Sequence, residues 1–149
     1  MNKFALGAVA LLVFGAAGAS SLKLDRVEGD SRIYKGRVQL SGEVVRNTDK
    51  ETVDQFGDYV CFVVKGESAR LIPRDDDNRA PWFCFSNEEA AFKALRLPAQ
   101  ARKGSCGYRV PAEIVVTDYV VAMLESAVAD NARLLTVKSR GTLKDIPCR

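Results

Sequence analysis

Hydrophobic and polar residues alternate along two segments of this chain, and each alternation predicts a β-strand with one buried face. In residues 35–46, Val38, Leu40 and Val44 fall on one face, and the residues of the other face are polar. Residues 58–65 alternate in the same way. The folded part of the chain is therefore expected to begin with two half-buried strands.

The strand at residues 58–65 has two candidate partners. Residues 66–67 could form a tight turn that leads directly into a neighbouring strand. Alternatively, residues 81–85 are the main partner, and the segment before them is a long insertion. We favour the second pairing because one register then satisfies both the core and a disulfide. This register sets three pairs opposite each other: Cys61 with Cys84, Phe62 with Phe83, and Val60 with Phe85.

One helix and two further strands are expected in the second half of the chain. Ser86 and Glu89 have the spacing of a capping box, which begins a helix, and Pro98 stops it. Residues 112–124 are rich in β-branched and aromatic side chains, which favour a strand, although their end could be helical. We expect a strand there, then a loop, and a last strand at residues 134–137.

Residues 1–19 predict a secretory signal peptide. Lys3 supplies a positive charge, residues 4–19 are apolar, and residues 17–19 (AGA) provide a cleavage site before Ser20. The apolar run is shorter than the ~20 residues that a membrane span needs. We therefore expect a periplasmic or secreted protein with no membrane anchor after cleavage.

The remaining residues predict one domain that follows a short arm. Residues 20–35 are polar and mixed in charge, and we expect a loosely held N-terminal arm there. Residues 36–149 are long enough for a single core, and residues 47–57 within them are polar, which predicts a loop. The formal net charge is only +3, so the balance of charge does not indicate a dedicated nucleic-acid binder.

The cysteines predict two disulfides. Cys61, Cys84, Cys106 and Cys148 all follow the signal peptide, and an even number of cysteines in an exported chain indicates disulfide pairing. Of the three possible pairings we favour Cys61–Cys84, which would join two strands, with Cys106–Cys148, which would anchor the C-terminal tail. A zinc site is the alternative, but no two of these cysteines have the close spacing that zinc sites use.

The expected order of elements is three strands, one helix and two strands. Residues 40–45 (LSGEVV), and residues 82–85 (WFCF) running into the helix, resemble the small exported bacterial OB-fold proteins. Some of those proteins are related to the anticodon-binding type of OB domain. The resemblance covers residues 36–138 and implies an OB-like five-stranded Greek-key barrel with one helix between strands 3 and 4. It rests on pattern and order, so no functional residues follow from it.

Several catalytic chemistries lack their residues in this sequence. The chain contains no histidine, which removes Ser-His-Asp and Cys-His catalysis and most catalytic metal sites. Oxidised cysteines leave no thiolate nucleophile. Asp75, Asp76 and Asp77 are consecutive and flanked by arginines, which predicts a solvated turn, because a calcium loop needs alternating oxygen ligands. We therefore expect no metal, no cofactor and no enzymatic activity.

The aromatic residues could form a surface on which a base or a sugar stacks, and core packing is the alternative for each of them. Phe83 and Phe85 should pack in the core, whereas Tyr59 and Trp82 should share the opposite face of the sheet. We expect a non-enzymatic module that binds a protein or envelope ligand. Single-stranded nucleic-acid or polysaccharide binding through the barrel face is the alternative, and a small hydrolase is a third hypothesis. The expected binding surface consists of Tyr59, Val63, Trp82, Arg70, Arg74 and Arg79.

Overall fold

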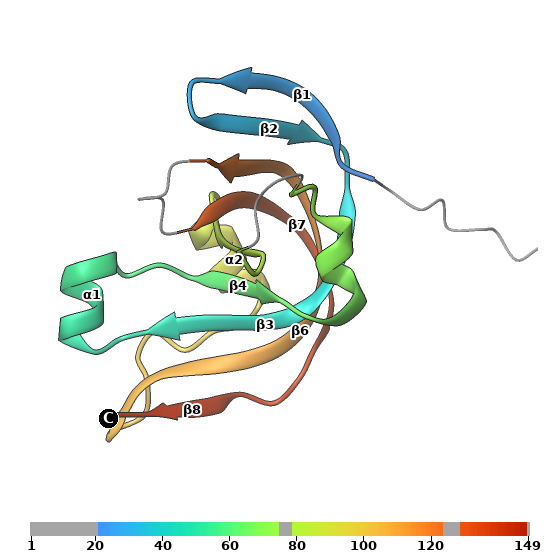
Figure 1. Ribbon diagram of the computed structural model, residues 1–149. Coiled ribbons are helices and arrows are strands. Elements are labelled where there is room, and N and C mark those ends of the chain that lie inside the picture. Colours follow the sequence, from blue (N-terminus) through green and yellow to red (C-terminus); the bar gives the residue numbers. More distant parts are fainter. Residues whose placement is uncertain (1–20, 75–78, 124–128, 149) are drawn as a thin grey trace, which may run out of the picture.

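The computed structural model describes residues 21–74, 79–123 and 129–148 (Figure 1). These ranges contain eight strands, two α-helices and one short 3₁₀ helix. The expectation of a mainly β protein is therefore confirmed. In chain order the elements are β1 (Lys23–Glu28), β2 (Ser31–Lys35), β3 (Val38–Asn47), α1 (Lys50–Phe56), β4 (Cys61–Val64), η1 (Gly66–Leu71), β5 (Trp82–Phe85), α2 (Glu88–Ala94), β6 (Ser105–Ala122), β7 (Asp130–Arg140) and β8 (Lys144–Pro147).

Five of the strands close into a ring in the order β3–β4–β5–β7–β6 and back to β3. Every neighbouring pair in the ring is antiparallel except β5 and β7, which run parallel with Phe83 opposite Asp130 and Phe85 opposite Ala132. Along the chain, the ring strands β3, β4 and β5 are separated by α1 and η1, and α2 lies between β5 and the last two ring strands, β6 and β7. The segment that carries α2 therefore leads from β5 to β6.

The long strand β6 holds most of the sheet together. Its residues 107–116 pair with β3 along one edge, and residues 112–120 pair with β7 along the other edge. Beyond these partners, β2 pairs with residues 119–122 and β8 pairs with residues 105–109. With 18 residues, β6 is long enough to carry two strands on each of its edges.

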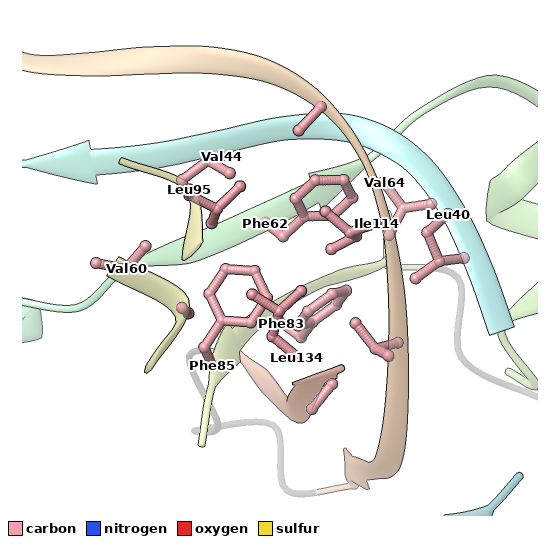
Figure 2. Packing of buried hydrophobic residues seen from close by; sticks show 14 of the residues in the cluster. Leu40, Val44, Val60, Phe62, Val64, Phe83, Phe85, Leu95, Ile114 and Leu134 are labelled. Atoms are coloured by element: carbon pink, nitrogen blue, oxygen red, sulfur yellow. The ribbon is translucent and has the colours of Figure 1, made fainter. Parts of the chain in front are cut away.

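Aromatic side chains fill the centre of the ring. The Phe83 ring centroid lies 5.5 Å from that of Phe62, 5.6 Å from that of Phe85 and 5.4 Å from that of Tyr119. Each fully buried side chain of this size contributes about 1.5–3 kcal/mol by leaving water. Aliphatic side chains surround the rings, as Figure 2 shows for Leu40, Val44, Val60, Val64, Leu95, Ile114 and Leu134.

The helix α2 does not begin with the capping box expected at residues 86–89. Its N-cap is Asn87, whose side chain makes no hydrogen bond to the helix backbone. Instead, the Asn87 amide donates to the carbonyl oxygen of Leu134 and accepts from the Leu134 N–H, both at 2.9 Å. Glu88 accepts from the Val60 N–H at 3.2 Å. The helix lies where the sequence predicts it, but its polar start binds neighbouring segments.

The expectation of a loosely held arm over residues 20–35 is wrong for residues 23–35. These residues form the hairpin of β1 and β2, and β2 continues the sheet by pairing with β6, with Tyr34 opposite Tyr119. Every residue of β1 is exposed, so this strand has no buried face, and a bulge at Asp25 interrupts the alternation that would mark a strand in the sequence.

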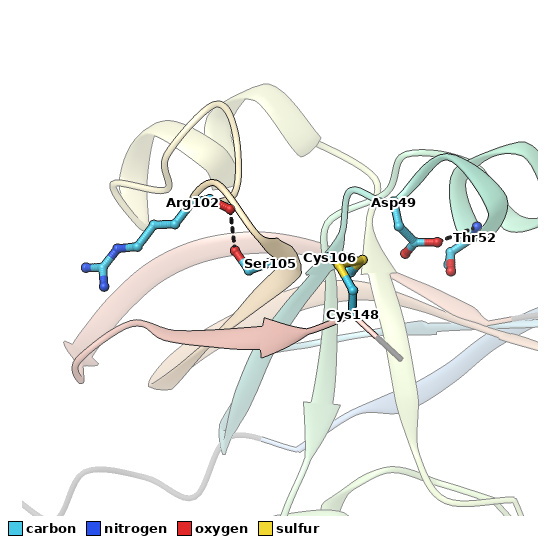
Figure 3. Close-up of a disulfide and its surroundings, with 6 residues drawn as sticks. All are labelled: Asp49, Thr52, Arg102, Ser105, Cys106 and Cys148. Carbon is cyan, nitrogen blue, oxygen red and sulfur yellow. Dashed lines mark hydrogen bonds between the residues drawn. A yellow bond between two sulfur atoms is a disulfide. The ribbon is translucent and has the colours of Figure 1, made fainter.

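Two other elements were not expected from the sequence. Residues 47–57, predicted as a loop, contain the helix α1, which Asp49 caps by accepting from the Thr52 N–H at 2.9 Å (Figure 3). The C-terminal tail forms β8, which pairs with β6 through Lys144 opposite Arg109. Both elements are short and mostly polar, so neither carries a clear hydrophobic period.

Both disulfides join the cysteines that the sequence analysis paired. Cys61–Cys84 connects β4 to β5, and Cys106–Cys148 connects the start of β6 to the residue after β8 (Figure 3). In the loop-closure view, bridges across separations of 23 and 42 residues stabilise the fold by about 3–4 kcal/mol each. Disulfides of this kind persist in oxidising compartments.

Several sequence expectations fall on residues outside the described ranges. These are the signal peptide at residues 1–19, the acidic cluster at residues 75–77, and the end of the expected strand at residues 112–124, which is confirmed as a strand as far as Ala122. Among the helices of the described ranges, none combines the length and the hydrophobicity that crossing a membrane requires.

Candidate binding groove

A groove of about 350 Å³ lies on the outer face of β3, β4 and β5. These strands turn Phe62 and Phe83 toward the core, so their alternate residues point outward. We call this hollow the aromatic groove. Its lining residues are Val45 and Asn47 from β3, Cys61 and Val63 from β4, Trp82 and Cys84 from β5, and Thr52, Gly57 and Tyr59 from α1 and the connection that follows it.

Two rows of paired residues run across the three strands. The first row sets Val45 opposite Cys61, which in turn lies opposite its disulfide partner Cys84. The second row sets Val63 opposite Trp82. The Val63–Trp82 pair is therefore the next one on the same face after the disulfide, and these side chains form a continuous apolar surface with Val45.

Gly57 permits the position that Tyr59 occupies beside this surface. Its backbone has a φ of +85° and a ψ of 163°, a conformation that residues other than glycine rarely adopt. A Cβ atom at Gly57 would also lie only 2.3 Å from the Tyr59 ring. The Tyr59 ring thus packs directly against the glycine backbone while 56% of the residue stays exposed.

An ion pair holds the connection that carries Tyr59. Arg46 donates two hydrogen bonds of 2.8 Å to the two carboxylate oxygens of Asp58, and a third of 3.0 Å to the carbonyl oxygen of Ala99. The Arg46 guanidinium also lies 5.2 Å from the centre of the Phe92 ring, a cation–π distance. Asp58 adjoins Tyr59 in the chain, so this contact fixes one end of the groove.

The same ion pair shifts the ionisation of both partners. Hydrogen bonds from the Arg46 guanidinium hold the pKa of the Asp58 carboxyl below its ordinary value. The hydrogen bond to Asp58 raises the pKa of Arg46 further above its already high value, although partial burial counteracts it. Asp58 is therefore ionised, and Arg46 charged, over the whole neutral range.

The lining of the aromatic groove carries no formal charge at neutral pH. Its nine residues include no Asp, Glu, Lys or Arg, and both of its cysteines are oxidised. Glu43 lies in the same cross-strand row as Trp82, but it is not part of the lining and it pairs with Lys65 at 2.5 Å. Such a lining suits neutral, apolar or aromatic groups that stack on rings.

Three of the six residues expected to form a binding surface meet in the aromatic groove. Tyr59, Val63 and Trp82 line it together. Strand alternation places Val63 and Trp82 on this face, whereas Tyr59 lies before β4 and packs against Gly57.

The three arginines of the expected surface are not among the lining residues. Arg74 forms an ion pair with Asp130, Arg79 donates to the carbonyl oxygen of Ala122 at 2.7 Å, and Arg70 pairs with a neighbouring glutamate in η1. The first two contacts reach β7 and β6, which are distant in sequence, so no local pattern could have revealed them.

Four lining residues were not singled out from the sequence. Val45 and Asn47 stand on the strand that pairs with β4, and Thr52 and Gly57 belong to α1 and its end. A local signal was present for the helix, since an Asp at the N-cap and a Gly at the C-cap bracket seven residues. No signal marks Val45, because its position depends on which strand lies beside β4.

A polar cluster around Asp130 lies inside the fold, and none of its residues lines the groove. Asp130 is only 1% exposed and accepts hydrogen bonds from the Tyr119 hydroxyl at 2.8 Å, the Ala122 N–H at 3.2 Å and Arg74. Burial raises the pKa of Asp130, and the hydroxyl and guanidinium donors counteract that rise. These donors satisfy the buried carboxylate and join β6, β7 and the segment after η1, which is a structural role.

Searches against protein-family models, curated proteins and solved structures gave no match to this chain. In the described ranges, no group of three or more His, Cys, Asp or Glu side chains is placed to hold a metal ion.

Proposed function

We propose that this protein is an exported, non-catalytic binding module, and that its aromatic groove takes an apolar or aromatic side chain of a partner protein in the cell envelope. The observation that carries this proposal is the joint placement of Trp82 and Tyr59 on an uncharged surface beside a disulfide. Aromatic anchors of this kind dominate the energy of many protein interfaces. The apolar run of residues 4–19 and the two disulfides support export.

We further propose that the ring is an OB-like Greek-key barrel, related to the small exported bacterial OB-fold proteins that residues 40–45 and 82–85 resemble. The closed order β3–β4–β5–β7–β6, with α2 between the third and fourth ring strands, supports this architecture. In such a barrel, the face of the second and third strands is a usual binding surface. The aromatic groove lies over β4 and β5, which hold those places here.

Site-specific crosslinking in the native envelope tests the proposal. A photoreactive residue at position 59 should capture a partner protein, and the same residue at Leu135, which is 42% exposed on β7, should not capture it. Trp82→Ala should reduce the capture at position 59 severalfold, while Leu135→Ala leaves it unchanged. Equal capture from both positions would contradict the proposal. Mass spectrometry of the recovered chain should find an N-terminus at Ser20.

Neutral polysaccharide binding is the second candidate, because the half-buried Trp82 and the exposed Tyr59 beside the polar side chains of Asn47 and Thr52 also suit a sugar ring. Trp82 is the only tryptophan of the chain, so its fluorescence reports on the groove directly. A saturable change in emission with a neutral oligosaccharide would support this candidate. A change with oligothymidine that disappears at high salt would indicate nucleic acid instead.

A further inference from the structure

The strand β1 presents an open edge. Within the described ranges it pairs only with β2, and all six of its residues are exposed. In Figure 1 the β1–β2 hairpin, in blue, extends beyond the ring, with β1 as its outer strand. A strand edge of this kind carries unpaired N–H and C=O groups, which can form hydrogen bonds with a strand of another molecule.

A bulge in β1 places its two apolar residues on one face. The pairing with β2 shifts by one residue between Leu24 and Arg26, so that Asp25 is the extra residue. Leu24 and Val27 are three residues apart in sequence, but the extra residue brings them to the same side of the hairpin. They are 55% and 56% exposed, so this side is an uncovered apolar surface.

The charged residues of β1 take the opposite face. Once Asp25 is set aside as the bulge, Lys23, Arg26 and Glu28 alternate with the two apolar residues. The hydrogen bond from Arg26 to Glu28 is consistent with this arrangement, since it joins side chains two paired positions apart. The five paired residues therefore read, in order, as basic, apolar, basic, apolar and acidic.

This order is complementary to itself in an antiparallel arrangement. A second β1 laid along the first, with a two-fold axis at Arg26, sets Leu24 of each copy opposite Val27 of the other. The same register sets Lys23 of each copy opposite Glu28 of the other, on the same face. A two-fold axis perpendicular to the sheet keeps both faces in place, so apolar residues meet apolar residues and opposite charges meet.

The centre of this arrangement brings two Arg26 side chains together. In each copy Arg26 already forms ion pairs with Asp25 and Glu28 of its own chain. Each arginine thus brings its own acidic neighbours, which reduces the repulsion between the two guanidinium groups.

We propose that this protein forms a two-fold symmetric homodimer through antiparallel pairing of its β1 strands. The two sheets then continue into each other across the β1 edges. The proposal does not depend on the proposed binding function, because no residue of β1 lines the aromatic groove. An interface built on one short strand is small, so we expect a weak dimer with a dissociation constant on the order of 10 μM.

Sedimentation equilibrium with charge-reversal variants tests both the dimer and its register. Lys23→Glu sets two acidic residues opposite each other, and Glu28→Lys sets two lysines opposite each other. Each variant alone should dimerise at least tenfold more weakly than the wild type. An equimolar mixture of the two variants should recover the wild-type affinity, because each mixed pair then joins opposite charges. Lys144→Glu on β8 is the matched control and should not change the equilibrium.

Circular dichroism establishes that each variant is folded, and the double variant K23E/E28K gives a second test, since it should dimerise as well as the wild type. A wild-type protein that stays monomeric up to millimolar concentration would overturn the proposal and would assign the charges and the bulge of β1 to edge protection. A dimer whose mixed variants do not recover affinity would overturn the antiparallel register.

Discussion

Single residues decide how the aromatic groove is shaped. Gly57 fixes the Tyr59 ring against its backbone, and the alternation of β4 and β5 turns Val63 and Trp82 toward the same hollow. The sequence predicts Val63 and Trp82 as neighbours because strand alternation and the cysteine pair specify the same register. It does not predict Gly57, because the ring that a Cβ would displace becomes its neighbour only after the chain has turned at the end of α1.

Replacing Gly57 should disturb the groove. Gly57→Ala forces a side chain into a backbone region nearly exclusive to glycine and pushes its Cβ into the Tyr59 ring, at a cost of about 1–3 kcal/mol. We expect a lower melting temperature and altered Trp82 fluorescence. Gly66→Ala is the control, since Gly66 also has a positive φ, of 62°, but has open space around it. If the two variants change the Trp82 emission equally, Gly57 has no special role in the groove.

The helices and strands differ in how clearly the sequence predicts them. The pairing of β4 with β5 could be predicted because hydrophobic alternation and a cysteine pair specify the same register. The hairpin β1–β2 and the strand β8 could not, because a bulge interrupts the alternation of β1 and β8 is only four residues long. The start of α2 shows a third case, in which the local pattern of residues 86–89 predicts the helix but the polar groups bind partners from other elements.

The connection between α1 and β4 should respond to acid. The pKa of Asp58 is lowered in the folded protein by Arg46, so this contact contributes stability at pH values above the ordinary Asp pKa of about 3.9. That contribution is lost as the pH falls through the lowered pKa of the folded state. Trp82 fluorescence should therefore change reversibly below about pH 4 and before global unfolding.

Asp58→Asn is the variant that checks this assignment. It removes the titrating group and keeps a similar shape, so the acid-induced change in Trp82 emission should disappear, and melting at neutral pH should occur at a lower temperature. A wild-type transition that persists unchanged in this variant would mean that another carboxyl group causes it.

At the scale of the whole molecule, two disulfides and the long strand β6 connect parts of the chain that are distant in sequence. The disulfide Cys106–Cys148 attaches β8 to the start of β6, on the far side of β6 from β3. Neither cysteine lines the aromatic groove, although Gly107, which follows Cys106, pairs with the lining residue Asn47. Within the described residues, β8 itself pairs only with β6. The contribution of this disulfide should therefore be to stability.

Removing this link should separate stability from binding. The double variant Cys106→Ala, Cys148→Ala should lose about 3–4 kcal/mol of unfolding free energy, which denaturant unfolding measures. Its crosslinking at position 59 should match the wild type at temperatures where it is folded. Loss of crosslinking in the folded double variant would show that β8 supports the groove after all.

The parallel pair of β5 and β7 has a consequence for how the protein is made. The last ring strand spans Asp130–Arg140, so a nascent chain cannot complete the ring until these residues have left the ribosome. Contacts between such distant segments form slowly. A product truncated before residue 130 would leave one side of β5 bare and free to capture another polypeptide, which makes premature termination a direct route to aggregation.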